Sequence, residues 1–182
     1  MDRVKKPLVI HPILFALFPI LFVFSHNIGQ IPPKQLVFPI VVTILITLIL
    51  WSALFFLVKN RIKAGLILCV FLIMFFSYLH INTLIDAPIS KLLNILIDLE
   101  KALKSPNINI VILYRVLTDW VIFIIWVAAL LLFTYLILRS HRSLFGLNTF
   151  LNATSVALIL ISAGNIGTFY FKKQSVLASE VL

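Results

Sequence analysis

Polar side chains that could recognise a ligand gather at two places between long apolar runs. The first group is His26 and Asn27, and the second is Ser77, Tyr78 and His80. Imidazole, amide, hydroxyl and phenol groups together supply the donors and acceptors that a phosphate or sugar headgroup of a lipid would need. A histidine can also become positively charged at mildly acidic pH. These five residues are therefore the candidate headgroup-binding site.

A simpler interpretation of the same residues stays open. Tyr, His and Asn are common at membrane interfaces, where their polar ends meet water and hydrogen-bond the backbone of nearby loops. His11 and His141, which flank other apolar runs, are expected at the interface for the same reason. Cys69 lies within an apolar run and is expected to pack as a small hydrophobic residue.

No arrangement of residues in the sequence indicates catalysis. Glycine-rich phosphate loops, Cys-x-x-Cys pairs and Gly-x-Ser-x-Gly are absent, and the six acidic residues are widely dispersed. The sequence therefore predicts no catalytic residues, no metal ligands and no cofactor. Charged residues inside the apolar runs, which ion-coupled transport would require, are also missing apart from Asp119 at the edge of one run. An enzyme is not expected.

The elements that position the polar groups are apolar helices. The chain has 182 residues, of which 62% are hydrophobic and 12% charged, and its mean hydropathy is +1.15. A soluble protein averages about half apolar and a quarter charged residues, so this composition predicts an integral membrane protein. Although the formal net charge is +9, the basic residues sit in small groups beside apolar runs and form no stripe suited to nucleic acid.

The predicted fold is an all-α bundle of about five transmembrane helices with one amphipathic interfacial helix, all in one domain. The lengths of the apolar runs, at about 1.5 Å of rise per residue, match a hydrocarbon core of about 30 Å. The spans are expected at about 7–25, 36–58, 64–84, 117–138 and 150–171, the amphipathic helix at about 89–104, the domain over 1–174 and a short tail over 175–182.

The basic residues predict the orientation. With the N-terminus in the cytoplasm, eight of the fifteen Lys and Arg residues lie inside: Arg3, Lys5, Lys6, Lys59, Arg61, Lys63, Arg139 and Arg142. The outer count comes mostly from the segment between Asp86 and Asp119, where four of the six acidic residues accompany the basic ones. An odd number of spans then places the C-terminus outside.

Three stretches carry a resemblance to a known family. They are the run His11-Pro12-Ile13-Leu14-Phe15-Ala16-Leu17-Phe18-Pro19-Ile20-Leu21-Phe22, the loop Ser25-His26-Asn27-Ile28-Gly29-Gln30, and Phe75-Phe76-Ser77-Tyr78-Leu79-His80. Together with Phe150-Leu151-Asn152 before the last apolar run, the chain resembles the N-terminal membrane region of some bacterial sulfatase-like proteins of the alkaline phosphatase superfamily. In that family the membrane region precedes an extracytoplasmic metal-dependent hydrolase or phosphotransferase domain.

The resemblance implies the membrane module alone, because only nine residues follow Lys173 and they include no nucleophile or metal-binding pairs of such a domain. It implies a location in the bacterial plasma membrane. We therefore expect a non-enzymatic membrane anchor or scaffold whose partners are membrane lipids and, by the resemblance, a membrane or extracytoplasmic protein. The alternatives are a small transporter or channel component, or the membrane subunit of a separately encoded extracytoplasmic hydrolase.

Overall fold

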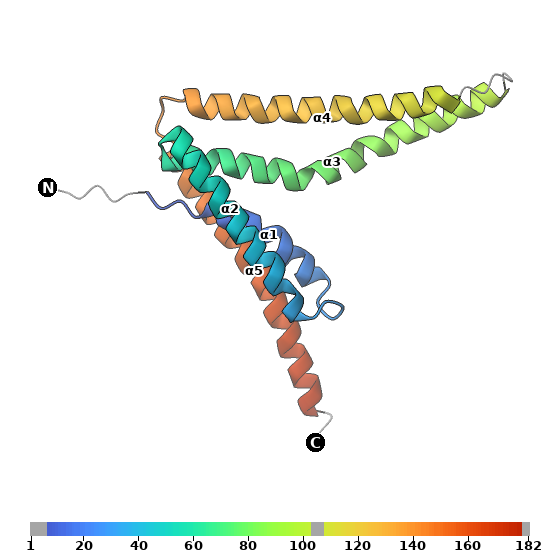
Figure 1. Cartoon of the computed structure of the whole chain (residues 1–182). Helices are drawn as coiled ribbons and strands as arrows, with labels where there is room; N and C mark the ends of the chain where they lie inside the picture. The colour runs from blue at the N-terminus through green and yellow to red at the C-terminus, as the bar shows by residue number, and fades with distance from the viewer. Residues whose placement is uncertain (1–6, 103–107, 180–182) are drawn as a thin grey trace. The chain divides into compact units, whose positions relative to one another are not determined.

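A computed structural model describes residues 7–102 and 108–179 of the chain. These residues form the α-helices α1 (His11–His26), α2 (Val37–Val58), α3 (Arg61–Ala102), α4 (Ile108–Arg139) and α5 (Phe145–Ser179), together with the 3₁₀-helix η1 (Pro33–Leu36) (Figure 1). No strand occurs in the described part of the chain. The predicted all-α membrane fold is confirmed.

Four helical stretches are long and apolar enough to cross a membrane: Pro33–Val58, Arg61–Tyr78, Asp119–Arg139 and Phe145–Ser175. The first predicted span corresponds to α1, which is apolar but has only 16 residues. At about 1.5 Å per residue, α1 is shorter than a typical hydrocarbon core is thick. The chain therefore fits a multi-pass membrane protein, with four candidate spans and one shorter apolar helix among the described residues.

The predicted break between the third span and the amphipathic helix is not seen. Helix α3 runs without interruption from Arg61 to Ala102 and contains Pro88 in its interior. The sequence pattern Asp86-Ala87-Pro88 predicted a new helix start because proline lacks a backbone N–H and disfavours a helical residue before it. Residues 89–102 instead form the C-terminal part of α3, while 103 and 104 lie outside the described residues.

The chain divides into two compact units. The first comprises Met1–Leu72 and Leu136–Leu182, and the second comprises Ile73–Tyr135. Helix α3 begins in the first unit and continues into the second, and α4 passes back from the second unit into the first. Each unit is described separately below.

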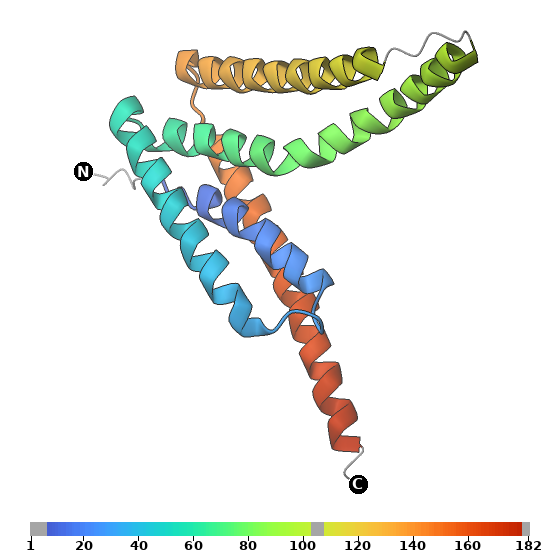
Figure 2. The same cartoon turned by 45° about the vertical axis from the view of Figure 1, so that its right-hand side comes forward.

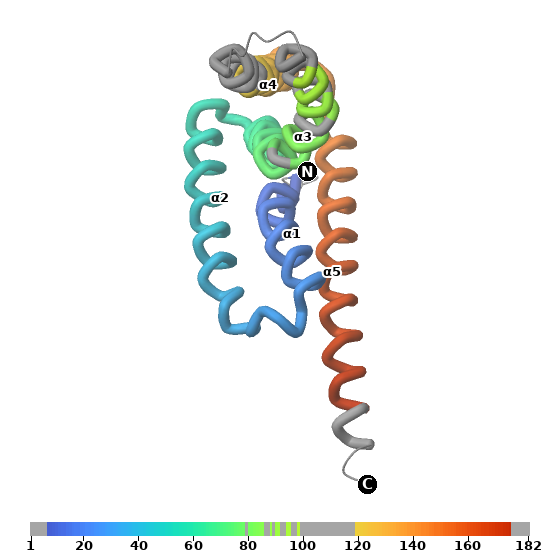
Figure 3. The backbone as a smooth tube through the Cα atoms, turned by 90° about the vertical axis from the view of Figure 1, so that its right-hand side faces the viewer, coloured from blue at the N-terminus to red at the C-terminus, as the bar shows by residue number. Residues whose placement is uncertain are grey.

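In the first unit, α1 lies between α2 and α5 and packs against both (Figure 3). α1 and α2 run in opposite directions and are joined by the loop that contains Gly29, whose φ of +143° suits glycine. A side chain at Gly29 would also approach Phe169 of α5, with Phe169 Cζ lying 3.7 Å from a Cβ at this position. The loop therefore contacts α5 and also connects α1 to α2.

The buried core of the first unit lies mainly at the start of α3. Within the span Arg61–Tyr78, 44% of the residues are buried, against 6% in Pro33–Val58. The fully buried residues include Ala64, Leu66, Leu68 and Cys69, and Cys69 packs as expected. Helix α2 thus presents apolar side chains over most of its surface, as a helix facing lipid does.

The second unit consists of the continuation of α3 and most of α4, which run alongside each other in opposite directions (Figure 2). The indole N–H of Trp126 on α4 donates a hydrogen bond to the Met74 carbonyl oxygen on α3, at 3.1 Å. The ring of Tyr78 lies edge-on to Trp126, with their centroids 6.0 Å apart. These contacts fix the spacing of the two helices at this level.

Candidate functional site

The predicted residues at the end of α1 turn back toward their own helix. The Asn27 amide donates to the Val23 carbonyl at 2.7 Å, and His26 Nδ1–H donates to the Phe22 carbonyl at 2.9 Å. The imidazole also stacks near the Phe22 ring, with a centroid distance of 4.2 Å. Both bonds return to carbonyls one turn earlier on the same helix, so they are local side-chain-to-backbone contacts at its C-terminal end. They match the simpler interfacial interpretation of His26 and Asn27.

The other predicted residues lie on α3 in the second unit. The Ser77 hydroxyl donates to the Ile73 carbonyl at 2.6 Å, so it satisfies the backbone of its own helix. His80 is exposed, and Tyr78 is partly buried against Trp126. His26 and Asn27 belong to the first unit and these three residues to the second. Their grouping into one headgroup site therefore stays a prediction.

A buried polar junction, which the sequence did not reveal, joins α5 to the start of α1. The Asn152 side-chain oxygen accepts hydrogen bonds from the backbone N–H groups of Ile10 and His11, at 3.1 and 3.0 Å. Its amide nitrogen donates to the Leu8 carbonyl at 2.8 Å, which fixes the orientation of the amide. Asn148, one turn earlier on α5, donates to the same carbonyl at 2.9 Å.

Asn152 caps the N-terminal end of α1, although it lies on another helix. The residue at the N-cap position is Ile10, whose side chain cannot accept a hydrogen bond, and Pro12 has no N–H to satisfy. The next two N–H groups, from Ile13 and Leu14, donate to the Ile10 carbonyl. A single amide on a distant helix therefore completes the hydrogen bonding of this helix end.

His11 is buried within this junction, which corrects its predicted interfacial position. Its side chain is 0% exposed, and Nδ1 lies 3.1 Å from Asn152 Oδ1. Because Asn152 Oδ1 can only accept, the proton is on His11 Nδ1. His11 Nε2 and Asn148 Oδ1 are both buried without a hydrogen-bond partner among the described residues. His141, by contrast, is exposed as an interfacial residue would be.

Gly65 on α3 allows the junction to close. A Cβ at Gly65 would lie 2.5 Å from Val9 Cγ1 and 3.5 Å from both Cε1 and Nε2 of His11. Real Cβ atoms essentially never approach another carbon as closely as 2.5 Å, so any larger residue at position 65 would force Val9 or its surroundings to shift. The spacing of Asn148 and Asn152 by four residues on an apolar helix was the one sequence signal of a polar contact on this face.

Basic residues gather at the two short turns of the first unit and at the helix ends beside them. They include Lys59, Arg61, Lys63, Arg139, His141 and Arg142. Lys63 joins the turns, because its Nζ donates to the carbonyls of Leu138 and Ser140 at 2.7 and 3.0 Å. The guanidinium of Arg61 lies over the Phe55 ring, 5.6 Å from its centroid. No acidic residue occurs at positions 7–72 or 136–179 to balance this charge.

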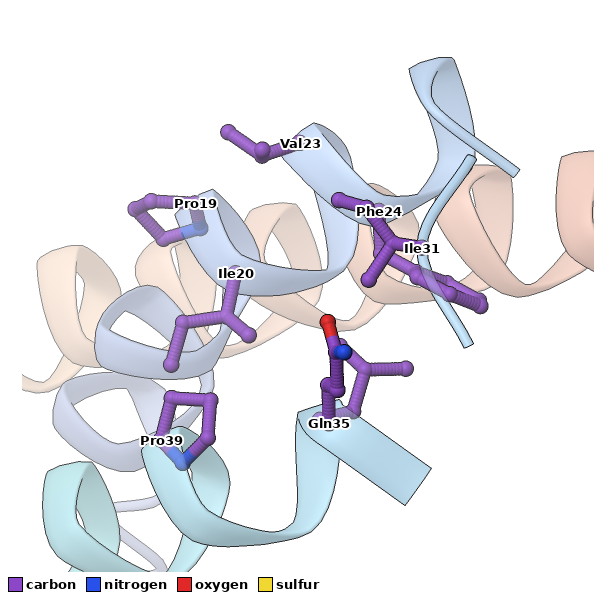
Figure 4. A pocket seen from close by; sticks show the side chains of 8 residues that line it. Pro19, Ile20, Val23, Phe24, Ile31, Gln35 and Pro39 are labelled. Carbon is purple, nitrogen blue, oxygen red and sulfur yellow. The ribbon is translucent and has the colours of Figure 1, made fainter. Parts of the chain in front are cut away.

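A pocket of about 430 Å³ lies between α1, η1 and α2 in the first unit. Its walls are almost wholly apolar: Pro19, Ile20, Val23, Phe24, Ile31, Leu36 and Pro39, with Gln35 as the only polar side chain. Figure 4 shows the Gln35 amide pointing into the space between the helices. Such a surface suits hydrocarbon and offers little to orient a polar ligand.

A smaller pocket of about 240 Å³ lies between α3 and α4 in the second unit. It is lined by Tyr78, Asp119, Trp120 and Phe123. The predicted site residue Tyr78 thus lines this pocket. The other three come from α4, and the sequence placed Asp119 at the edge of a span without linking it to Tyr78.

The described residues contain no group of three or more His, Cys, Asp or Glu side chains that could hold a metal ion. Comparison with models of protein families, with curated proteins and with solved structures found no match to this chain.

Proposed function

We propose that this chain is a non-enzymatic membrane anchor or scaffold. The observation that carries the proposal is the set of hydrogen bonds that polar side chains of the first unit make to backbone groups of neighbouring segments. Asn148 and Asn152 fasten α5 to the start of α1, and Lys63 fastens the start of α3 to the end of α4. Polar side chains inside a membrane protein are costly unless they are paired or functional. The side-chain nitrogens of Asn148, Asn152 and Lys63 all donate to backbone carbonyls, while Asn148 Oδ1 has no partner among the described residues.

The apolar surfaces of the helices support the same role. Only 6% of the residues in an 18-residue apolar stretch of each of the spans Pro33–Val58 and Asp119–Arg139 are buried, and the mean hydropathies are 2.8 and 2.9. Large apolar side chains such as Phe56 and Leu57, which are 75% and 80% exposed, need a lipid environment. The resemblance to the membrane region of sulfatase-like proteins is compatible with an anchor in the bacterial plasma membrane.

Fusion to a soluble fluorescent reporter tests the anchoring role. The fusion should stay in the membrane pellet after alkaline carbonate extraction, and the reporter alone should be washed off. Release of the fusion by carbonate would contradict stable insertion.

Reconstitution tests the rival transport role. Liposomes that contain the purified chain should leak small ions and polar solutes no faster than empty liposomes. Faster flux that is abolished by substitutions in the helices would instead indicate a transporter or channel component.

A further inference from the structure

The pocket between α3 and α4 combines one carboxylate with three aromatic rings. Asp119, Trp120 and Phe123 lie within five residues of one another on α4, and Tyr78 lines the pocket from α3. Trp120 and Phe123 lie one turn apart, and their rings meet edge to face with centroids 6.1 Å apart and an interplanar angle of 88°. The lining of this pocket is therefore mostly π-surface beside a single negative charge.

The Tyr78 ring, which forms one wall of the pocket, is held in place by its contact with Trp126. The Tyr78 ring contacts Trp126 at an interplanar angle of 65°, and Trp126 is itself tied to the Met74 carbonyl. Trp126 lies two turns beyond Asp119 on α4, so the same pair of helices positions both walls. A ring supported in this way can present a defined surface to a ligand at little cost in conformational entropy.

This chemistry selects an organic cation. The faces of aromatic rings attract ammonium groups, and clusters of rings are a recurrent means of binding methylated ammonium ligands. Asp119 adds direct charge attraction and repels phosphate. The ligand that fits is one whose ammonium group enters the pocket while its anionic part stays outside.

The position of the pocket along the two apolar helices indicates where such a cation comes from. Asp119 is the last charged residue before the apolar run that continues along α4 to Leu138, and Tyr78 lies among the polar residues Ser77, His80 and Asn82 toward the end of the predicted span 64–84. This sequence pattern is typical of the polar ends of spans, near the headgroups of a bilayer. We propose that it binds the alkylammonium headgroup of a zwitterionic phospholipid, an inference that rests on the proposed position of the chain in the membrane.

Lipid selectivity tests this proposal on the whole chain. Native mass spectrometry of the detergent-solubilised protein would be used with phosphatidylethanolamine, phosphatidylcholine and phosphatidylglycerol that share the same acyl chains. We expect the two ammonium lipids to bind about two- to fivefold more tightly than phosphatidylglycerol, the scale of a cation–π contact at an exposed site. Tetramethylammonium should compete with them at higher concentration. Equal binding of all three lipids, or no competition, would overturn the proposal.

Substitutions in the pocket locate the site. Asp119→Asn and Tyr78→Ala should each reduce the preference for ammonium lipids, whereas Tyr78→Phe should keep it because the ring remains. Asp98→Asn, which removes an exposed carboxylate from α3 outside the pocket, is the matched control and should have no effect. Unchanged preference in both Asp119→Asn and Tyr78→Ala would overturn the proposal.

Resistance of the chain to carbonate extraction is a separate measurement, so failure of lipid selectivity leaves the anchoring role standing.

Discussion

At the scale of single residues, Asn152 shows how a hydrophobic helix can begin without a capping residue of its own. Sequence neighbours of α1 supply only apolar side chains and a proline, so its first N–H groups depend on an acceptor 141 or 142 residues away. In a membrane these groups have few alternative partners, because water is scarce in the hydrocarbon region. The amide of Asn152 is therefore a structural residue whose loss should affect the whole first unit.

Asn152→Ala should lower the stability of the first unit by about 1–3 kcal/mol, because Ile10 N–H, His11 N–H and the Leu8 carbonyl lose a partner. The measurement is the midpoint of thermal unfolding in detergent micelles. Asn165→Ala is the matched control, since Asn165 lies on the same helix and is exposed. Equal shifts in the two variants would contradict the capping role.

Gly65→Ala should destabilise the chain by about 1–3 kcal/mol through overpacking, because its Cβ would collide with the buried Val9 side chain. Gly164→Ala, which has no neighbouring atom within 4 Å of the added Cβ, should be harmless. Adding Val9→Ala to Gly65→Ala should recover part of the loss. Strictly additive losses from these two substitutions would show that the contact is not the cause.

At the scale of helices, the ends of α2, α3 and α4 are shaped by the two basic turns. Helix α2 ends at Lys59, which adopts a left-handed conformation with φ of 56° and donates its N–H to the Phe55 carbonyl. Asn60 then caps α3, because its side-chain oxygen accepts from the Lys63 N–H at 3.1 Å. Lys63 in turn places its charge at the C-terminal end of α4, where the helix dipole favours a cation.

Lys63→Met should weaken this joint, because the Leu138 and Ser140 carbonyls lose their charged donor while the apolar stem of the side chain is retained. We expect a loss of about 1 kcal/mol, measured as a lower unfolding midpoint, since the site is partly exposed. Lys34→Met, at an exposed position on η1, serves as the control. A lower unfolding midpoint in Lys34→Met but not in Lys63→Met would contradict a stabilising bond between Lys63 and the end of α4.

The helices could be predicted from the sequence far better than the contacts between them. Hydropathy is a local property, so the runs around 36–58 and 150–171 predicted spans that α2 and α5 contain. Proline is a local signal too, but at Pro88 the helix continues, because a single missing N–H does not outweigh the turns on either side. The contact of His11 with Asn152 joins residues 141 positions apart, and neither local pattern indicates it.

The same limit applies to the candidate sites. Tyr78 was identified as a polar residue at the end of a span, and Asp119 as a charge at the edge of another. Their meeting in one pocket depends on the register between α3 and α4, which is set by Trp126 and Met74. Register is a property of packed side chains, so single-helix patterns could not reveal it.

At the scale of the whole molecule, the path of the chain across the membrane follows from one contact. Because Lys63 bonds to Leu138 and Ser140, the turn between α2 and α3 and the turn between α4 and α5 lie on the same membrane face. Helix α3 leaves this face and α4 returns to it. We expect α2 to cross toward this face and α5 to leave it, so the opposite face should carry the loop around Gln30 and the end of α5 near Lys173.

The abundance of Lys and Arg in the two turns predicts that their shared face is cytoplasmic. Single cysteines at Gln30, His141 and Lys173, all exposed positions, would be introduced after Cys69→Ala and treated with an impermeant maleimide on intact spheroplasts. Cysteines at positions 30 and 173 should be labelled at once, and the one at 141 only after permeabilisation. The reverse pattern would invert the orientation. Three helices, α2, α3 and α4, lie between positions 30 and 141 in the sequence. If each of them crosses the membrane, the two positions must be on opposite faces. Labelling of both positions from the same side would therefore contradict the proposed path of the chain.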